Sequence, residues 1–189
     1  GSAGAHGHAS FAFAERSIMI RFLLLLILGA MVGLALWAHW PARTLPVDAR
    51  VDRLVVEKSQ RLLLAYRGEE LLATYPVSFG TVPVGPKVRE GDRKTPEGRY
   101  HISEHKRDSS YHRALRVSYP GPEDVARGLR EGYSPGSDIM IHGLPNGHGY
   151  IGRLHRWRDW TAGCVALTNP EIDELFAAVV PDATVELRP

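Results

Sequence analysis

The only cysteine of the chain, Cys164, lies downstream of a histidine, His142. A thiolate is the strongest nucleophile among the side chains, but an ordinary thiol, with a pKa of about 8.5, is only a few per cent ionised near neutrality. A neighbouring imidazole can remove the thiol proton. The two residue types therefore predict nucleophilic cysteine chemistry, provided that the fold brings them together.

The residues beside this pair predict how they are positioned. Residues 139–141 form an apolar run typical of a buried strand, and this run leads directly into His142. Gly163 precedes Cys164, and a residue without a Cβ lets the backbone approach a substrate closely. We expect the histidine at the end of a strand and the cysteine in a glycine-containing turn.

The segment after the cysteine predicts a helix with two possible starts. In one, Asn169 is the cap and Pro170 the first helical residue. In the other, Thr168 and Glu171 form a capping box. Apolar residues then recur at core spacing, and the helix is expected to stop at Pro181.

The rest of the chain from residue 51 onward predicts a mainly β domain, because short apolar runs alternate with turn residues. The predicted strands are residues 53–57, 61–66, 71–75, 77–79, 100–102, 115–119 and 184–187. A short helix is expected over residues 122–130, with Gly132 just beyond its end. Residues 81–98 are rich in glycine and proline and predict a loop, which taken alone is as consistent with an ordinary surface loop as with a functional one.

The N-terminal part predicts a membrane segment. Residues 22–38 carry no charge, and with residues 18–20 the run reaches roughly the length that crosses a bilayer. Arg16 and Arg21 precede this run, which by the positive-inside rule sends the remainder across the membrane. We expect an uncleaved anchor rather than a cleaved signal, because small residues are missing after the apolar run. The expected parts are residues 1–18 as a tag or upstream extension, 19–40 as a transmembrane or signal segment, 41–50 as a linker and 51–189 as the exported domain.

Composition argues against several function classes. The net charge is only +2, and no Lys/Arg block indicates nucleic acid as a partner. His142, His155 and the cysteine fit no usual zinc spacing, so neither a metal nor another cofactor is expected. Cysteines of exported chains usually pair, and Cys164 has no partner in this chain. Its thiol is therefore either inert and buried or kept for chemistry.

These motifs together resemble the L,D-transpeptidase catalytic domain of the YkuD type. His142-Gly143 follows the predicted strand, residues 161–165 (Thr-Ala-Gly-Cys-Val) resemble the family's Ser/Thr-x-Gly-Cys signature, and Asn169 precedes a helix. Residues 92–98 (Asp-Arg-Lys-Thr-Pro-Glu-Gly) resemble the family's earlier loop. Each motif is weak by itself, but all occur in the family's order across residues 54–187. The resemblance therefore covers nearly the whole predicted domain.

The resemblance implies a YkuD-like β-sandwich with short helices, preceded by one N-terminal transmembrane or signal-anchor helix. It implies Cys164 as the nucleophile and His142 as the base and later the acid. The backbone carbonyl of Gly143 would orient the imidazole, and the backbone N–H of Gly163 would donate to the oxyanion. The substrate would be a peptidoglycan stem peptide, whose diamino-acid acyl group passes to an amine as D-alanine leaves. The implied location is the bacterial periplasm or the outer face of the inner membrane.

The chain departs from the commoner family pattern at two positions. Ala162 stands where a histidine usually precedes Gly-Cys, and Ala166 stands where an arginine is frequent. This Asp-Trp-Thr-x-Gly-Cys variant resembles a branch in which some members hydrolyse the wall's diamino-acid linkages, including those to attached lipoproteins. We expect five residues to line the substrate cleft in place of the missing histidine, with a packed, structured loop as the alternative. They are His155, Arg153, Asp159, Trp160 and Thr161.

Three functions are open at this point. The first is a transferase that crosslinks stem peptides, and the second is a hydrolase of the same linkage, acting as an L,D-carboxypeptidase or releasing wall-bound lipoprotein. The third is a non-catalytic, membrane-tethered module that binds the wall. The expected partners are peptidoglycan stem peptides, a wall-attached lipoprotein in the hydrolytic case, and the membrane through the N-terminal helix.

Overall fold

The computed structural model of the protein describes residues 5–40 and 45–189. The first four residues of the predicted extension and residues 41–44 of the predicted linker lie outside this described part. The chain divides into two units, Gly1–Trp40 and Pro41–Pro189.

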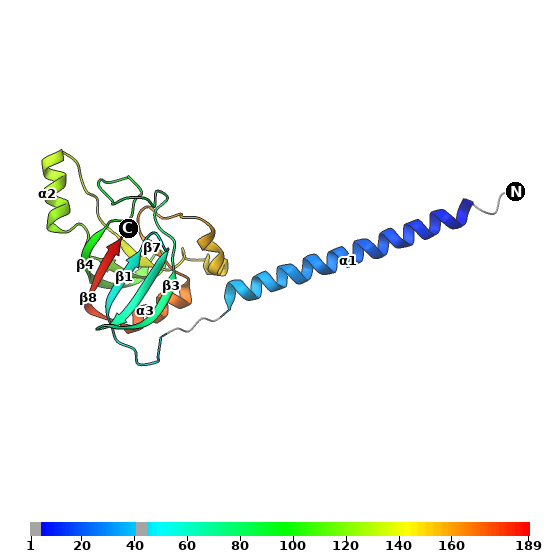
Figure 1. Ribbon diagram of the computed structural model, residues 1–189, viewed down its shortest axis with the longest axis horizontal. Helices are drawn as coiled ribbons and strands as arrows, with labels where there is room; N and C mark the ends of the chain where they lie inside the picture. The colour runs from blue at the N-terminus through cyan, green and yellow to red at the C-terminus, as the bar shows by residue number, and fades with distance from the viewer. Residues whose placement is uncertain (1–4, 41–44) are drawn as a thin grey trace. The chain divides into compact units, whose positions relative to one another are not determined.

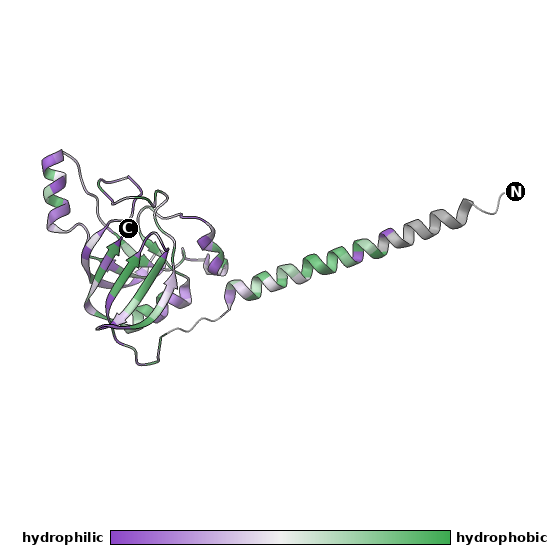
Figure 2. Cartoon of the chain, viewed as in Figure 1, coloured by the Kyte–Doolittle hydropathy of each residue, from purple (hydrophilic) through white to green (hydrophobic). Residues whose placement is uncertain are grey.

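The first unit contains one long helix, α1 (Ala5–His39) (Figure 1). Within it, Ile18–His39 is long and apolar enough to cross a membrane. Figure 2 shows the apolar residues continuing around this part of α1, without the polar face that a helix on a soluble core carries. The structure thus has the helix that the charge-free run predicted.

The second unit is built on a curled, mixed sheet of eight strands in the order β3-β2-β1-β8-β4-β5-β6-β7 (Figure 1). Its strands are β1 (Val51–Glu57), β2 (Leu62–Arg67), β3 (Glu70–Pro76), β4 (Gly98–Ser109), β5 (His112–Val117), β6 (Met140–His142), β7 (Val165–Ala166) and β8 (Val179–Arg188). Neighbours are antiparallel except for β1 with β8 and β6 with β7, which are parallel. The predicted mainly β class is confirmed.

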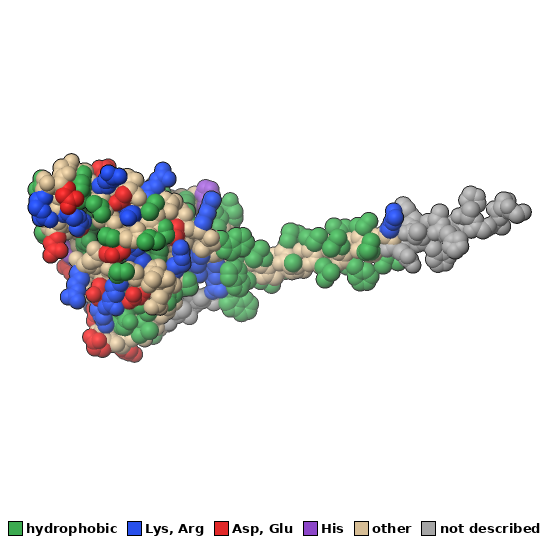
Figure 3. Space-filling model, turned by 45° about the horizontal axis from the view of Figure 1, so that its top comes forward, with side chains coloured by type: hydrophobic (Ala, Val, Ile, Leu, Met, Phe, Trp, Pro, Cys, Tyr) green, Lys and Arg blue, Asp and Glu red, His purple; other side chains and the backbone are tan. Residues whose placement is uncertain are grey.

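The central strands are apolar because they are covered on both faces. Leu54, Val55 and Val56 of β1 are all buried, and since consecutive residues of a strand point to opposite faces, both faces of β1 are covered. A strand in this position reads as a continuous hydrophobic run rather than an alternating one. On the face drawn in Figure 3, by contrast, cationic and anionic side chains are intermixed over the second unit.

Three helical segments complete this unit: α2 (Pro122–Glu131), the 3-10 helix η1 (Gly149–Trp157) and α3 (Asn169–Ala178). Helix α3 packs against β5. Its N-cap is Thr168, whose backbone N–H donates to Glu171 Oε2 at 3.0 Å, so the capping-box start is the observed one. Helix α2 ends at Glu131, and Gly132 just beyond it adopts the left-handed conformation expected of a C-cap glycine.

Two local predictions are wrong. Residues 77–79 form no strand but only isolated bridges at Ser78 and Gly80, because they cross from one part of the sheet to another. Pro181 does not stop the last helix, which already ends at Ala178, and instead lies inside β8. Proline lacks an N–H, so it is tolerated in a strand only where no ladder bond needs that donor.

Candidate active site

The register of two short strands places the cysteine and the histidine together. In the parallel pair β6 and β7, Ile141 lies opposite Val165 and His142 opposite Ala166. Continuing this register by one residue sets Cys164 beside Met140. Because side chains alternate between the two faces of a sheet, Met140, His142 and Cys164 then point to the same face.

On that face is an open cavity of about 460 Å³. Residues from β5, β6, the turn before β7 and the segment before β6 contribute to its wall. The lining side chains include Tyr111, Asp138, Met140, His142, Trp160 and Cys164. The nucleophile candidate and the base candidate therefore share one solvent-accessible space, and neither is sealed in apolar packing away from it.

The imidazole of His142 has a defined tautomer. Its Nδ1 lies 2.7 Å from the carbonyl oxygen of Gly143, and since a carbonyl only accepts, Nδ1 carries the proton. The lone pair is therefore on Nε2. Burial lowers the pKa of His142 to about 4, although the bond to Gly143 works in the opposite direction. The ring is thus a neutral base at neutral pH, and the ring of Tyr111 packs against it at 4.5 Å between centroids.

The His-Gly turn is held from below by the first turn of α3. Asn169 Oδ1 accepts a hydrogen bond from the backbone N–H of Leu144 at 2.9 Å. The same atom would lie 2.8 Å from a Cβ placed on Gly143. Glycine is therefore required at position 143 for the turn to approach the asparagine, which explains why these two motif residues occur together.

The thiol of Cys164 is protonated in the resting site. Its Sγ lies 3.6 Å from the backbone oxygen of Asp138. Burial raises the pKa of the Cys164 thiol, and the Asp138 carboxylate raises it further, while a backbone hydrogen bond from Met140 and the charge of Lys87 act against this. A neutral thiol and a neutral imidazole are therefore the starting pair, and the proton must move when the sulfur attacks.

The turn that carries the cysteine is closed by Thr161. Its Oγ1 donates to the carbonyl oxygen of Cys164 at 2.8 Å and accepts from the backbone N–H of Gly163 at 3.1 Å. The Gly163 N–H, expected from the sequence as an oxyanion donor, is thus engaged within the turn. The backbone N–H of Cys164 is the candidate that remains beside the sulfur.

The loop of residues 81–98 supports this turn. Gly163 has φ = 136°, and a Cβ there would lie 2.6 Å from the carbonyl oxygen of Lys94. Asp92 holds the loop by accepting from Lys87 Nζ at 2.9 Å and from three backbone N–H groups. Burial opposes the charge of Asp92, but these bonds lower its pKa to about 2. The loop packs directly under the residue before the nucleophile, so it belongs to the site.

Three charged side chains that sequence reasoning missed also line the cavity: Lys106 of β4, Arg116 of β5 and Asp138. Arg116 pairs with both Glu104 and Asp138. Lys106 forms no ion pair with any residue in the described part of the chain. Alternation along β4 and β5 predicts which residues of each strand share a face. Only the pairing of the strands places Lys106 and Arg116 on the face that carries the cavity.

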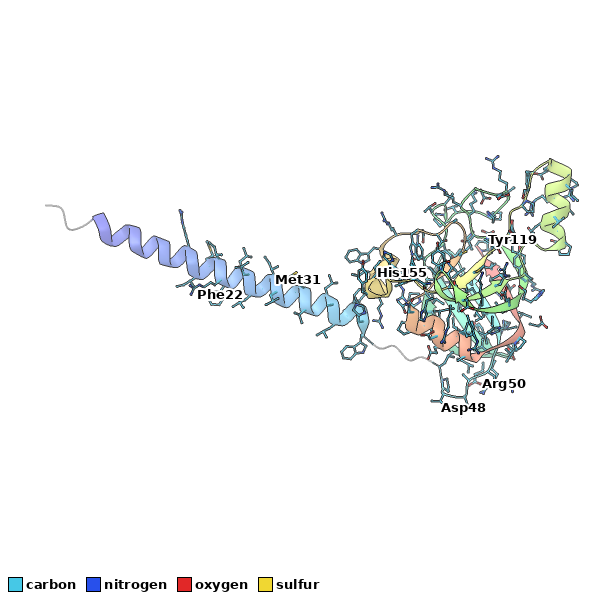
Figure 4. The ribbon with its side chains drawn as sticks, turned by 180° about the vertical axis from the view of Figure 1, so that it is seen from behind. Phe22, Met31, Asp48, Arg50, Tyr119 and His155 are labelled. Carbon is cyan, nitrogen blue, oxygen red and sulfur yellow. The ribbon has the colours of Figure 1, made fainter. Side chains whose placement is uncertain are left out.

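The five residues expected to line the substrate cleft lie in different places. Trp160 and Thr161 line the cavity with the cysteine. His155, on η1 (Figure 4), lines a neighbouring cavity that also contacts Trp160. Asp159 forms a two-pronged ion pair with Arg61 and accepts from the backbone N–H of Phe79. Arg153 is part of η1 and lines neither of these two cavities.

Comparison with known proteins gives this geometry its context. Residues 51–187 match the YkuD family, the L,D-transpeptidase catalytic domain. YafK of Escherichia coli K12, named provisionally as an L,D-transpeptidase, is 35% identical over 129 residues, which are 65% of this chain and 44% of YafK. The chain therefore spans less than half the length of the curated relatives that it matches.

Among the solved structures that share the fold, two illustrate the similarity. The helical cell shape determining protein Pgp2 of Campylobacter jejuni is 25% identical with a TM-score of 0.56. Bd1075 of Bdellovibrio bacteriovorus is 26% identical with a TM-score of 0.50. Each alignment covers 75% of this chain and 48% of the other. With the family match extending over nearly the whole second unit, the chain belongs to the YkuD family of L,D-transpeptidase catalytic domains.

Proposed function

We propose that this protein transfers an acyl group from a peptidoglycan stem peptide to an amine, through a thioester on Cys164. The observation that carries the proposal is that Cys164 and the neutral imidazole of His142 line one open cavity. A thiol, a base with its lone pair on the correct nitrogen, and a backbone donor beside the sulfur are the parts that acyl transfer requires. Family membership supports the reaction class.

In the proposed first half-reaction, His142 Nε2 accepts the thiol proton as Sγ bonds to the carbonyl carbon of the diamino-acid residue. The carbonyl oxygen becomes an oxyanion, to which the backbone N–H of Cys164 donates. The C–N bond then breaks, and His142 gives its proton to the amine of the departing D-alanine. The result is a thioester and a neutral imidazole, ready for a second cycle.

In the second half-reaction, the amine of another stem peptide attacks the thioester. His142 accepts a proton from this amine, the C–S bond breaks, and the proton returns to the sulfur. Bond formation and cleavage balance without any redox change, so the chemistry needs no oxidant or reductant. The tautomer set by Gly143 leaves Nε2 to act in both halves.

The charges around the cavity suit a zwitterionic end group. Lys106 offers a cation without an ion-pair partner in the described residues, and Asp138, paired with Arg116, offers a carboxylate that lines the same cavity. The free end of a diamino acid carries an ammonium and, in some wall types, a carboxylate beside it. Opposite charges on the protein would orient such a group and place its acyl carbon near Cys164.

The test is to incubate the full chain, in detergent micelles, with disaccharide tetrapeptides and to identify the products by mass. We expect release of D-alanine and formation of crosslinked dimers. Cys164→Ala should abolish both, and His142→Ala should slow them by about 10²- to 10⁴-fold, the usual contribution of a general base. His101→Ala, at an exposed histidine of β4, is the matched control and should match the wild type.

The products also separate the remaining functions. Tripeptide without dimers would identify the hydrolase, in which water attacks the same thioester, and this candidate is favoured by the Asp-Trp-Thr-x-Gly-Cys variant of the signature. Unchanged tetrapeptide, with correctly folded protein, would contradict any catalytic role and leave a wall-binding module. A dimer yield that persists in Cys164→Ala would likewise refute the thioester.

A further inference from the structure

The turn between β1 and β2 carries an arginine in an unusual backbone conformation. Arg61 has φ = 57°, in the left-handed region that glycine adopts freely and other residues rarely adopt. Its N–H donates to the carbonyl oxygen of Lys58 at 3.2 Å, so Arg61 closes a tight turn at a position where glycine is the usual residue. A residue held in such a conformation is a reason to ask what its side chain does.

The side chain of Arg61 binds the carboxylate of Asp159 with both ends of its guanidinium. Nη1 lies 2.6 Å from Oδ1, and Nη2 lies 2.8 Å from Oδ2. A two-pronged pair of this kind fixes the orientation of the carboxylate as well as its position. The side chain of Asp159 is only 7% exposed, whereas that of Arg61 is 47% exposed. The arginine therefore covers an almost buried carboxylate, whose charge needs a partner.

Asp159 in turn binds the segment of residues 77–79, which crosses between two parts of the sheet. Its Oδ1 accepts a hydrogen bond from the backbone N–H of Phe79 at 2.9 Å. Arg61 holds the same segment through its main chain, because its carbonyl oxygen accepts from the N–H of Val77 at 2.9 Å. Arg61 thus fixes this segment twice, once directly and once through the carboxylate.

The crossing segment also supports the turn that carries the cysteine. The carbonyl oxygen of Phe79 accepts from the N–H groups of Trp160, at 3.2 Å, and Thr161, at 3.0 Å. Trp160 lines the catalytic cavity, and Thr161 closes the turn by donating to the carbonyl oxygen of Cys164. Direct bonds therefore connect the guanidinium to the residue that carries the sulfur.

We propose that Arg61 is a positioning residue for Cys164, and that it acts through Asp159 to hold the cysteine turn where the sulfur meets the imidazole of His142. The inference rests on the proposed function. Arg61 does not line the catalytic cavity, so it acts by placing the turn and not by touching the substrate. The charged groups proposed to orient the substrate lie on β4, on β5 and before β6, outside this set of bonds.

Arg61→Gly tests the proposal without backbone strain, because glycine adopts the left-handed conformation freely. We expect the kcat for D-alanine release from disaccharide tetrapeptides, per folded molecule in detergent micelles, to fall about ten- to a hundredfold, the effect of a misplaced nucleophile. The KM should change little, because the groups that orient the substrate are untouched. Arg61→Lys keeps the charge but loses the two-pronged geometry, so its kcat should be intermediate. Gln60→Gly, at an exposed neighbour in the same turn, is the matched control and should match the wild type.

A second substitution tests whether the two residues act as a pair. Asp159→Asn removes the charge but keeps an oxygen that can accept from the Phe79 N–H, and it should lower kcat by a similar factor. Combining it with Arg61→Gly should lower kcat little further, because both changes remove the same pair. Losses in kcat that multiply would overturn the proposal. A smaller folded fraction with an unchanged kcat per folded molecule would also overturn it, because the ion pair would then serve stability alone.

Hydrogen exchange separates this inference from the proposed function, because it needs no turnover. In Arg61→Gly, the backbone amides of residues 159–164 should exchange about tenfold faster, while those of β4 and β8 keep their wild-type rates. Equal acceleration in all these segments, or none in residues 159–164, would reject Arg61 as a positioning residue even if the protein is a transferase. Selective acceleration, without any D-alanine release by the wild type, would retain the hold of Arg61 on the turn and reject the transferase.

Discussion

At the scale of single residues, the site depends on which nitrogen of each histidine carries a proton. His142 donates from Nδ1 to a backbone carbonyl, and His155 accepts at Nδ1 from an indole. The same side chain is thereby a base with a free Nε2 in one position and a donor through Nε2 in the other. Both rings are neutral because burial disfavours the imidazolium.

The pKa of His142 makes a prediction for the pH dependence of turnover. With its pKa lowered to about 4, the imidazole stays a base until the pH falls through that value. We expect kcat/KM for D-alanine release to decline on the acid side with a midpoint near pH 4, and not near 6.5 as for an ordinary histidine. Initial rates between pH 3.5 and 8, with circular dichroism at each pH to confirm folding, provide the measurement. A midpoint near 6.5 in folded protein would contradict the buried, neutral base.

At the scale of elements, the loop of residues 81–98 is a support for the nucleophile and not a free connection. Asp92 holds the middle of the loop together, and Lys58 of the turn after β1 fastens it near both ends. Lys58 is buried, and its Nζ donates to the carbonyl oxygens of Gly85 and Thr95 and to Glu97 Oε1 at 2.7 Å. The residues of the Asp-x-x-Thr-Pro-Glu-Gly motif therefore hold the loop in place and do not take part in the reaction.

Removing this fastening should cost stability and activity together. Lys58→Met leaves the Glu97 carboxylate and two carbonyl groups without their donor, and we expect a loss of about 3 kcal/mol in the free energy of unfolding. Urea unfolding of the full chain in micelles, followed by tryptophan fluorescence, measures it. Arg99→Met, which removes an exposed ion pair with Glu186, should change stability by less than about 0.5 kcal/mol. Equal losses in the free energy of unfolding for the two substitutions would show that the buried lysine does not hold the loop in place.

At the scale of the whole molecule, the chain combines two units that suit different surroundings. One contains a helix suited to a bilayer, and the other a mixed sheet whose core is buried from water. We propose that α1 anchors the sheet domain at the outer face of the inner membrane, close to the wall peptides that are its proposed substrates. The family match covers residues 51–187, which all lie in the sheet domain.

The two buried histidines predict how the folded sheet domain responds to acid. Their pKa values are lower in the folded state, about 4 and 3, than in the unfolded chain, so the unfolded state binds protons first as the pH falls below about 6.5. Stability should therefore be complete above pH 6.5 and decrease towards pH 4, by roughly 3 kcal/mol for each histidine. Urea unfolding at pH 7.5, 5.5 and 4.5 measures this slope. His155→Gln should make it shallower by about half, and an unchanged slope would show that His155 does not contribute to it.

Much of this protein is determined locally and is therefore readable in the sequence. The charge-free run, the capping box at Thr168, and the glycine after the second helix follow from contacts between residues close in the chain. The Cys164 and His142 pair was predicted from residue type and motif order, which reflect chemistry rather than geometry. Even the wrong end of the last helix shows the limit, because Pro181 lies in a part of β8 that is outside the paired registers with β1 and β4, where its missing N–H breaks no ladder bond.

Only the tertiary structure decided how these residues are arranged around the cavity. The parallel register of β6 and β7 puts the sulfur and the imidazole on one face, and a shift by one residue would have separated them. Tertiary packing also places His155 at a second cavity and pairs Asp159 with Arg61. The Gly163 N–H donates to Thr161 Oγ1 within its own turn. Each of these outcomes depends on partners far apart in the chain, whose pairing no local pattern of residues specifies.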